Sequence, residues 1–331
     1  MRLASFIDGV QAYQEHPYRR VMPDPSIVWI QGTTRILNFG SDINTNSILI
    51  VPSLVNRYYI LDLNEKHSFV RWLADRGFCP LIVDWGMPGP SEQNFSLCDY
   101  IKRLDCALDW VTNEMTCSAV TVIGYCMGGL LAMSMSLRNM RKVKNLVLLA
   151  TPWDFSSSGM GKSNVIKAVY PSIEALINFF GELPTDILQI FFAGLDPLLV
   201  ERKFVSFSKK NPEESDAISF VAIEDWVNDG VPLVAQVARE CFYDWYIKNS
   251  PSAGTWKVDG NSVDPIRFGK PTLLVVQTTD QIVPPGSAIA LAQALPRATL
   301  HRPLAGHVGM VVGSSAEEEM WKPVAKWLSA V

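Results

Sequence analysis

A cysteine in a glycine-rich turn between a strand and a helix is the feature that most constrains this chain. Residues 120–132 read VTVIGYCMGGLLA, a β-branched run followed by a turn and a helix start, with Cys126 at the turn. A side chain on so sharp a turn projects from the sheet edge, and its neighbours must be small. The helix N-terminus favours a thiolate there. The pattern predicts a nucleophile elbow; the alternative is a cysteine packed in the core.

Strand and helix patterns alternate on both sides of this turn. Residues 27–39 alternate polar and apolar side chains, as an antiparallel hairpin at a sheet edge does. Apolar runs typical of strands buried on both faces occur at residues 47–51, 78–85, 143–150 and 272–277. Helical spacing separates several of them, as at residues 98–115. The alternation predicts an α/β fold with a mainly parallel, twisted sheet and helices on both faces.

The alternation stops between residues 155 and 262, where aromatic and proline residues are frequent and the helical patterns are irregular. A stretch of this length is more than a plain loop. Because chain on both sides of it is needed to finish one sheet, we expect a mostly helical cap inserted into a single domain of residues 1–331. A separate small domain is the alternative.

Two polar loop residues follow late strands and can complete a catalytic group with Cys126. Asp280 follows the strand at 272–277, and His307 follows a strand near 298–301. Both therefore fall at the carboxyl ends of strands, where ligands bind in open α/β sheets. A nucleophile followed by an acid and then a histidine is the order found in α/β-hydrolases.

Each of these two residues has a competitor. His301 competes with His307, but it lies within an extended stretch, where packing or exposure to solvent is the expected role. Asp154, which follows the strand at 143–150, competes with Asp280. We expect the oxyanion hole to use the backbone N–H of Met127 and a second N–H from the loop after the strand at 47–51.

Composition excludes several other functions. The chain has 331 residues, of which 48% are hydrophobic and 19% charged, as in a globular protein. A net charge of −4 without a basic run does not favour nucleic-acid binding, and no apolar run reaches the length of a membrane span. Six cysteines without a C-x-x-C pair and only four histidines predict no metal site. The N-terminus has no signal-peptide pattern, which predicts a cytoplasmic protein with reduced thiols.

Segments along most of the chain resemble the poly(3-hydroxyalkanoate) synthases, and most closely the class III type of catalytic subunit. They are PSLVNRYYILDL at 52–63, VDWGMP at 83–88, GYCMGG at 124–129, TPWDF at 151–155, DQIVPP at 280–285 and GHVG at 306–309. They occur in order and span about residues 50 to 330. The G-x-C-x-G-G box is the most specific of them.

The resemblance implies an α/β-hydrolase fold and an acyltransferase that polymerises (R)-3-hydroxyacyl groups. Cys126 would take the acyl group from coenzyme A, a substrate rather than a bound cofactor, with its thiolate activated by His307. Asp280 would support the histidine or assist the hydroxyl of the growing chain. Val55 occupies the position proposed for the second oxyanion donor. The resemblance also implies a polyester product, a second synthase subunit, a homodimer and a place at the polyester granule surface.

Two other functions fit the same residues. A cysteine hydrolase, either a thioesterase or a polyester depolymerase, would use the same triad with water as the acceptor. A catalytically silent granule-surface or scaffold protein would retain the fold alone, although an intact triad in the expected order argues against it.

Overall fold

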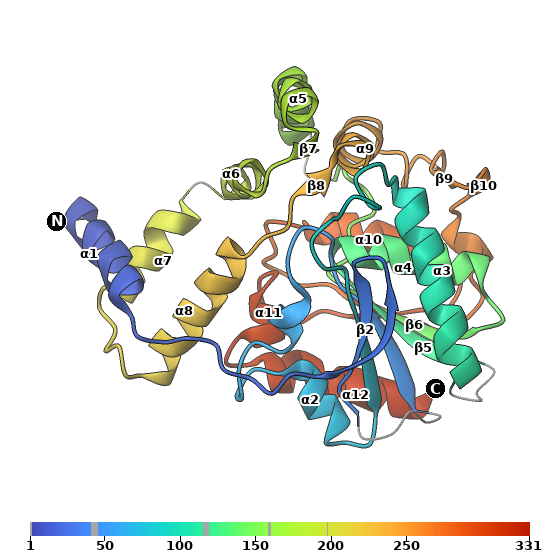
Figure 1. Cartoon of the computed structure of the whole chain (residues 1–331), viewed down its shortest axis with the longest axis horizontal. Coiled ribbons are helices and arrows are strands. Elements are labelled where there is room, and N and C mark those ends of the chain that lie inside the picture. The colour runs from blue at the N-terminus through green and yellow to red at the C-terminus, as the bar shows by residue number, and fades with distance from the viewer. Residues whose placement is uncertain (1, 41–45, 115–118, 158–159, 197) are drawn as a thin grey trace.

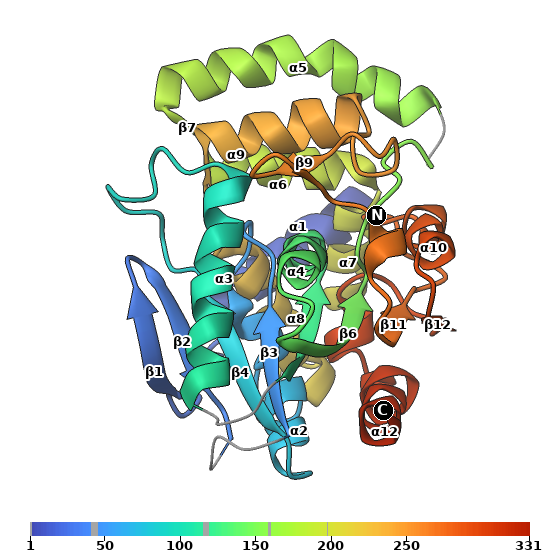
Figure 2. The ribbon, with the colours of Figure 1, turned by 90° about the vertical axis from the view of Figure 1, so that its right-hand side faces the viewer.

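The computed structural model describes residues 2–40, 46–114, 119–157, 160–196 and 198–331. Its centre is an eight-stranded sheet. The strands are β1 (Ser26–Gln31), β2 (Thr34–Asn38), β3 (Ser47–Val51), β4 (Cys79–Asp84), β5 (Val120–Tyr125), β6 (Val143–Leu149), β11 (Thr272–Val275) and β12 (Ala298–His301). They lie in the order β1-β2-β4-β3-β5-β6-β11-β12 (Figures 1 and 2).

The sheet is mainly parallel, as the sequence predicts. Strands β1 and β2 form an antiparallel hairpin at one edge, and β2 pairs with β4 in the antiparallel sense. The six strands from β4 to β12 run parallel to one another. Every residue of β3 and of β5 is buried, because both faces of a parallel sheet are covered by helices. The predicted α/β fold is therefore confirmed.

Two hydrophobic cores lie on the two faces of the sheet. Alternate residues of β3 enter different cores: Leu49 belongs to one and Ile48 to the other, as the two-residue period of a strand requires. The first core contains residues of α3 (Leu97–Glu114), α4 (Met127–Arg138) and α10 (Pro285–Ala294); the second contains residues of α2 (Phe69–Ala74), α11 (Gly309–Val312) and α12 (Lys322–Ala330).

A helical region lies in the sequence between the neighbouring strands β6 and β11. It contains α5 (Met160–Phe180), α6 (Thr185–Leu195), α7 (Leu199–Phe207), α8 (Ser215–Asn228), α9 (Ala235–Arg239) and a π-helix (Glu240–Ile247). Figure 2 shows α5, α6 and α9 above the end of the sheet toward which the strand arrows point. We call residues 155–262 the cap; its standing as an insertion into one domain stays a prediction.

The cap also contains strands that the sequence did not predict. Among its described residues the cap has four strands, each two residues long: β7 (Glu182–Leu183), β8 (Leu233–Val234), β9 (Lys257–Val258) and β10 (Asn261–Ser262). They pair as β7 with β8 and β9 with β10. Two residues are too few to produce the alternation by which a strand is recognised in a sequence.

An N-terminal helix, α1 (Arg2–Glu15), is a second element that the sequence patterns did not reveal. It lies beside α7 and away from the sheet (Figure 1). A Cβ at Gly9 would lie 2.1 Å from the Phe204 carbonyl oxygen, so glycine permits this close approach. The Phe204 ring also meets those of Phe6 and Tyr13 edge to face, with centroids 6.0 and 5.9 Å away. The N-terminal helix therefore packs on the cap.

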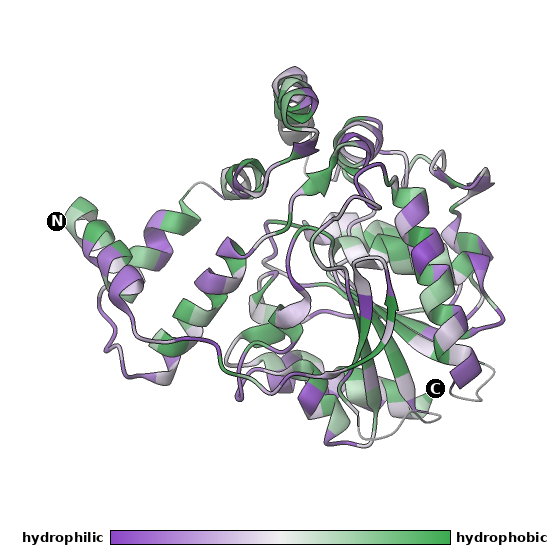
Figure 3. Cartoon of the chain, viewed as in Figure 1, coloured by the Kyte–Doolittle hydropathy of each residue, from purple (hydrophilic) through white to green (hydrophobic). Residues whose placement is uncertain are grey.

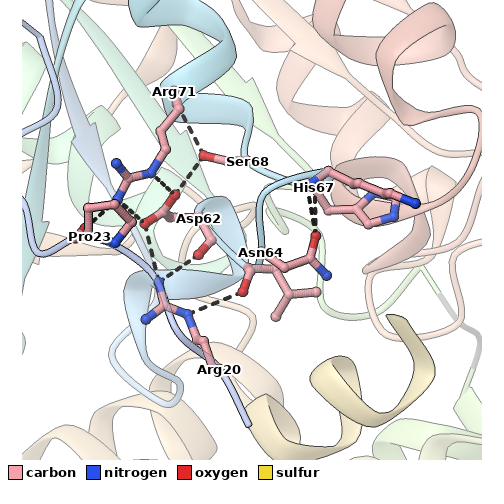
Figure 4. Close-up of polar contacts among 9 residues, drawn as sticks. Arg20, Pro23, Asp62, Asn64, His67, Ser68 and Arg71 are labelled. Carbon is pink, nitrogen blue, oxygen red and sulfur yellow. Dashed lines mark hydrogen bonds and ion pairs between the residues drawn. The ribbon is translucent and has the colours of Figure 1, made fainter. Parts of the chain in front are cut away.

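The segment after α1 is tied to the loop before α2 by a buried carboxylate. Asp62 accepts hydrogen bonds from Arg71 Nε at 2.7 Å, from Ser68 Oγ at 2.7 Å and from an Arg20 guanidinium nitrogen at 3.2 Å (Figure 4). Burial of a carboxylate is tolerated when it is paired in this way.

The colouring by hydropathy shows α6 as largely apolar (Figure 3). Some apolar side chains of the cap are exposed, including Ile190 of α6 at 68% and Phe179 of α5 at 82%. Among the described residues, none of the helices combines the length and the apolar character that a membrane crossing needs.

Candidate active site

Cys126 lies at the turn between β5 and α4, where the sequence places a nucleophile elbow. Its backbone has φ 54° and ψ −128°, a conformation that a residue with a Cβ rarely adopts. The turn is held by hydrogen bonds from Cys126 N to Leu149 O at 2.8 Å and from Gly129 N to Cys126 O at 2.9 Å. Strain of this kind persists only where the surrounding structure enforces it, and it is concentrated at functional sites.

The glycines around Cys126 allow β5, α4 and β3 to approach one another. A Cβ at Gly128 would lie 2.2 Å from Val51 O, and a Cβ at Gly124 would lie 2.4 Å from the Gly129 Cα. Both contacts involve backbone atoms, which cannot be moved aside by a rotamer change. The glycine requirement expected from the sequence therefore has a steric cause.

His307 and Asp280 lie at the same end of the sheet and form a hydrogen-bonded pair. The Asp280 Oδ2 atom is 2.7 Å from His307 Nδ1. The other carboxylate oxygen accepts hydrogen bonds from the backbone N–H groups of Ile282 and Val283, both at 2.9 Å. Asp280 is only 2% exposed, so these contacts fix the carboxylate and orient the imidazole.

The remaining ring nitrogen of His307, Nε2, is not engaged by Asp280, and the Cys126 side chain lies close enough to influence the pKa of the imidazole. Burial alone would lower the pKa of His307. The adjacent Cys126 thiolate and the Asp280 carboxylate outweigh burial and raise the pKa of His307 to about 10. At neutral pH the raised pKa of His307 favours its imidazolium form, which places a positive charge beside the Cys126 side chain.

Tyr125, which precedes the cysteine, supports the imidazole. Its ring stacks on that of His307 with centroids 5.5 Å apart, and its hydroxyl donates to the His307 carbonyl oxygen at 3.4 Å. Burial, followed by the nearby Cys126 and Asp280 charges, raises the pKa of Tyr125 well above its ordinary value. The sequence does not reveal this role of Tyr125, because an apolar strand gives no sign of which of its residues meets a distant loop.

The two competing residues have other partners. His301 lies on β12 and its ring hydrogen-bonds the Glu319 carbonyl oxygen. Asp154 accepts hydrogen bonds from Ser156 Oγ at 2.6 Å and from Asn249 Nδ2 at 2.8 Å. Burial would raise the pKa of Asp154, but these hydrogen bonds lower it below the ordinary value. The geometry thus brings Asp280, and not Asp154, to His307.

The two expected oxyanion donors have different surroundings. Met127 is the first residue of α4, so its N–H belongs to the helix N-terminus beside Cys126. Val55 lies on the loop after β3, and its N–H donates to Ser53 Oγ at 3.3 Å. The Trp85 indole fixes the start of this loop by donating to Pro52 O at 3.0 Å.

Aromatic side chains of the cap form a cluster that includes Tyr246, a residue near Cys126. The Tyr246 ring lies 4.8 Å from that of Phe155 and 5.5 Å from that of Phe191, centroid to centroid. Burial and then the nearby Cys126 charge raise the pKa of Tyr246. The richness of the cap in aromatic residues is visible in the sequence, but its irregular spacing does not indicate which of them approach Cys126.

Comparison with known proteins places these features in a family. A sequence model of the alpha/beta hydrolase fold matches residues 46–314. The solved structure of a Paleococcus ferrophilus monoacylglycerol lipase has a TM-score of 0.58 and 17% identity over 90% of this chain and 98% of the lipase. A thermophilic esterase from Thermogutta terrifontis has a TM-score of 0.53 and 15% identity over 95% of this chain and 99% of the esterase. At these identities the likeness concerns the fold alone.

Several similar curated proteins carry the name poly(3-hydroxyalkanoate) polymerase subunit PhaC. That of Haloferax mediterranei is 30% identical over 92% of this chain and 63% of the relative, and that of Haloarcula marismortui is 31% identical over 85% and 60%. That of Thiocystis violacea is 29% identical over 85% of this chain and 80% of the relative. The chain therefore spans about three fifths of the length of the Haloferax and Haloarcula relatives.

Proposed function

The chain belongs to the alpha/beta hydrolase fold family, and from this premise we propose that it polymerises (R)-3-hydroxyacyl-CoA into poly(3-hydroxyalkanoate) through a thioester on Cys126. The observation that carries the proposal is the strained Cys126 beside the buried His307–Asp280 pair. The relatives named as polymerase subunits, at about 30% identity, support this choice of acyl group and acceptor.

In the proposed first half-reaction, the Cys126 thiolate attacks the thioester carbonyl carbon of the acyl-CoA. A new carbon–sulfur bond forms and the bond to the coenzyme A sulfur breaks. The departing coenzyme A thiolate takes the proton from the His307 imidazolium, leaving a neutral imidazole and an acylated cysteine. Coenzyme A is thus part of the substrate, and the proposal includes no bound cofactor.

In the second half-reaction, the hydroxyl group of a growing chain is the acceptor. His307 Nε2 removes its proton as the hydroxyl oxygen attacks the Cys126 thioester, and Asp280 stabilises the imidazolium that forms. The carbon–oxygen bond forms, the carbon–sulfur bond to Cys126 breaks, and the thiolate–imidazolium pair is restored. In both half-reactions the Met127 and Val55 N–H groups would stabilise the oxyanion.

The aromatic side chains around Tyr246 support transfer over hydrolysis. Closely packed rings leave little room for bulk water, which would otherwise hydrolyse the acyl-enzyme. With water as acceptor, the same residues would instead make a thioesterase or a polyester depolymerase. That reaction is the direct rival that an experiment must separate.

The proposed location is the cytoplasm, at the surface of the polyester granule. Exposed apolar residues of the cap, such as Phe179 and Ile190, support contact with an apolar surface. Cys98, Cys126 and Cys241 form no disulfide with another described residue, which suits a reducing compartment. A second synthase subunit and a homodimer are the protein partners included in the proposal.

The test is to supply the purified protein with (R)-3-hydroxybutyryl-CoA and to follow free coenzyme A, polymer and free hydroxy acid together. The proposal predicts coenzyme A release in step with polymer. Free hydroxy acid without polymer would contradict it and identify a hydrolase.

Two cysteine variants complete this assay. Cys126→Ala is expected to abolish coenzyme A release, whereas Cys106→Ala, which removes an exposed thiol elsewhere, should not change it. Equal turnover by wild type and Cys126→Ala would mean that Cys126 is not the nucleophile.

A further inference from the structure

The loop that carries Val55 is held by the cap as well as by the sheet. The backbone N–H of Val231 donates to Val55 O at 3.0 Å, and Asn56 forms an isolated antiparallel bridge with Gly230. Through these contacts the cap backbone at Gly230 and Val231 lies alongside the loop at Val55 and Asn56. The Val55 peptide is therefore fixed on its carbonyl side by a residue of the cap.

Side chains reinforce this contact on the residues that follow Val55. Asp229, the C-cap of α8, accepts hydrogen bonds from Arg57 Nε at 3.3 Å and from the Tyr59 hydroxyl at 2.9 Å. The Trp226 indole donates to Arg57 O at 2.8 Å and is itself 6% exposed. We call residues 226–231 the cap clamp.

Steric fit also restricts the cap clamp. A Cβ at Gly230 would lie 2.4 Å from Thr185 Cγ2, at the start of α6, and 3.5 Å from Val55 O. The Gly230 backbone thus lies between a second cap helix and the loop. A shift of α6 or α8 would be transmitted to Val55.

We propose that the cap clamp positions the Val55 N–H for the oxyanion, which makes Asp229 a positioning residue for acylation of Cys126. The inference rests on the proposed function, in which Val55 is an oxyanion donor. The Val55 N–H has a competing acceptor, Ser53 Oγ, at 3.3 Å. The Val55 carbonyl belongs to the peptide that follows Val55, whereas its N–H belongs to the peptide that precedes it. The contact with Val231 therefore restrains the backbone on one side of the Val55 Cα and limits how far the preceding peptide can turn toward other acceptors.

The Arg57–Asp229 ion pair suits a test of this kind, because it contributes little to folding. The Asp229 side chain is 47% exposed and that of Arg57 is 23% exposed. Solvent-exposed pairs contribute little to stability. Removing the Asp229 carboxylate should therefore leave the protein folded while loosening the loop.

The experiment compares two reactions of the same thiol in the full chain. Acylation by p-nitrophenyl acetate, followed as a burst of p-nitrophenolate, passes through an oxyanion; alkylation by iodoacetamide does not. We expect Asp229→Ala to slow the acylation burst by about tenfold or more, since small misplacements of a donor are costly. Alkylation should be unchanged, because it depends on the Cys126–His307 pair alone.

Two further variants separate positioning from general damage. Tyr59→Phe removes one Asp229 contact and should slow acylation less than Asp229→Ala does. Asp196→Ala removes another C-cap carboxylate of the cap, paired with Arg202 at 2.7 Å, and should change neither reaction.

The outcomes distinguish the inference from the proposed function. A wild-type burst that Asp229→Ala and Tyr59→Phe both leave unchanged overturns the inference alone. Equal slowing of acylation and alkylation in Asp229→Ala also overturns it, because the clamp would then act on the thiol. Absence of a Cys126-dependent burst in the wild type overturns the proposed function and this inference together.

Discussion

The elbow and the cap clamp hold two halves of the same site by different means. Cys126 is fixed by the strained backbone of its own turn and by glycines whose close contacts are with neighbouring strands and helices of the sheet domain, such as Val51 of β3. Val55 is fixed partly by contacts such as that between Arg57 and Asp229, which are 172 residues apart. The nucleophile is therefore a property of the sheet, whereas the oxyanion donor depends on the position of the cap. Substitutions in the elbow should therefore slow both alkylation and acylation of Cys126, whereas substitutions in the cap clamp should slow acylation alone.

The largest effect is expected from breaking the elbow itself. Gly128→Ala introduces a Cβ 2.2 Å from Val51 O, so β3 and α4 must separate. We expect both alkylation and acylation of Cys126 to fall about a hundredfold or more, with a loss of about 1–3 kcal/mol in the free energy of unfolding. Gly269→Ala, where the added Cβ meets nothing within 4 Å, is the matched control. Wild-type rates for Gly128→Ala would show that the close approach is not required.

The next effect tests the pair that orients the imidazole. Asp280→Asn removes the charge that faces His307 Nδ1 and favours the wrong tautomer, so acylation should fall by up to about a hundredfold, the lower end of what a general acid–base group contributes. Asp280→Asn should also slow alkylation of Cys126 at neutral pH, whereas a substitution in the cap clamp should not. Asp154→Asn, a substitution at the competing aspartate, should have no such effect on either rate. If Asp154→Asn slowed both reactions and Asp280→Asn did not, Asp154 would be the acid that supports His307.

A smaller effect concerns stability and pH. The pKa of His307 rises from its ordinary 6.5 to about 10 in the folded protein. The imidazolium therefore stabilises the fold fully below pH 6.5, and this contribution is lost as the pH rises through about 10. The difference in the free energy of unfolding between wild type and His307→Gln, measured with urea, should shrink across this range. A difference that grows with pH would contradict a raised pKa of His307 in the folded protein.

The smallest effect is expected for Tyr125→Phe. The substitution removes a long hydrogen bond, 3.4 Å from the Tyr125 hydroxyl to His307 O, and keeps the ring that stacks on the imidazole. We expect a change of about 0.5 kcal/mol in the free energy of unfolding and unchanged alkylation of Cys126. A large loss of thiol reactivity would mean that the hydroxyl, and not the ring, supports His307.

The elbow half of the site could be predicted from the sequence because its signals are local. Strands buried on both faces appear as apolar runs, and the turn around Cys126 needs glycines for steric reasons. Asp280 and His307 follow from the rule that parallel strands present their carboxyl ends at one edge.

The clamp half could not be predicted in this way. Asp229 contacts Arg57 and Tyr59, which lie far from it in the sequence, and no repeating pattern of residues links the two segments. An aspartate at the end of a helix is also common in turns, so it does not by itself indicate a distant partner. The two-residue strands β7 to β10 and the packing of α1 on α7 were missed for the same reason. Such elements are defined by what they touch rather than by a pattern of their own.

The most direct test of the account is the mass of the protein after brief exposure to (R)-3-hydroxybutyryl-CoA. The account predicts a gain of one or more 3-hydroxybutyryl units, located on the peptide that contains Cys126 and absent from Cys126→Ala. An adduct on another residue, or a substrate consumed without any acyl-enzyme, would contradict covalent catalysis at the elbow.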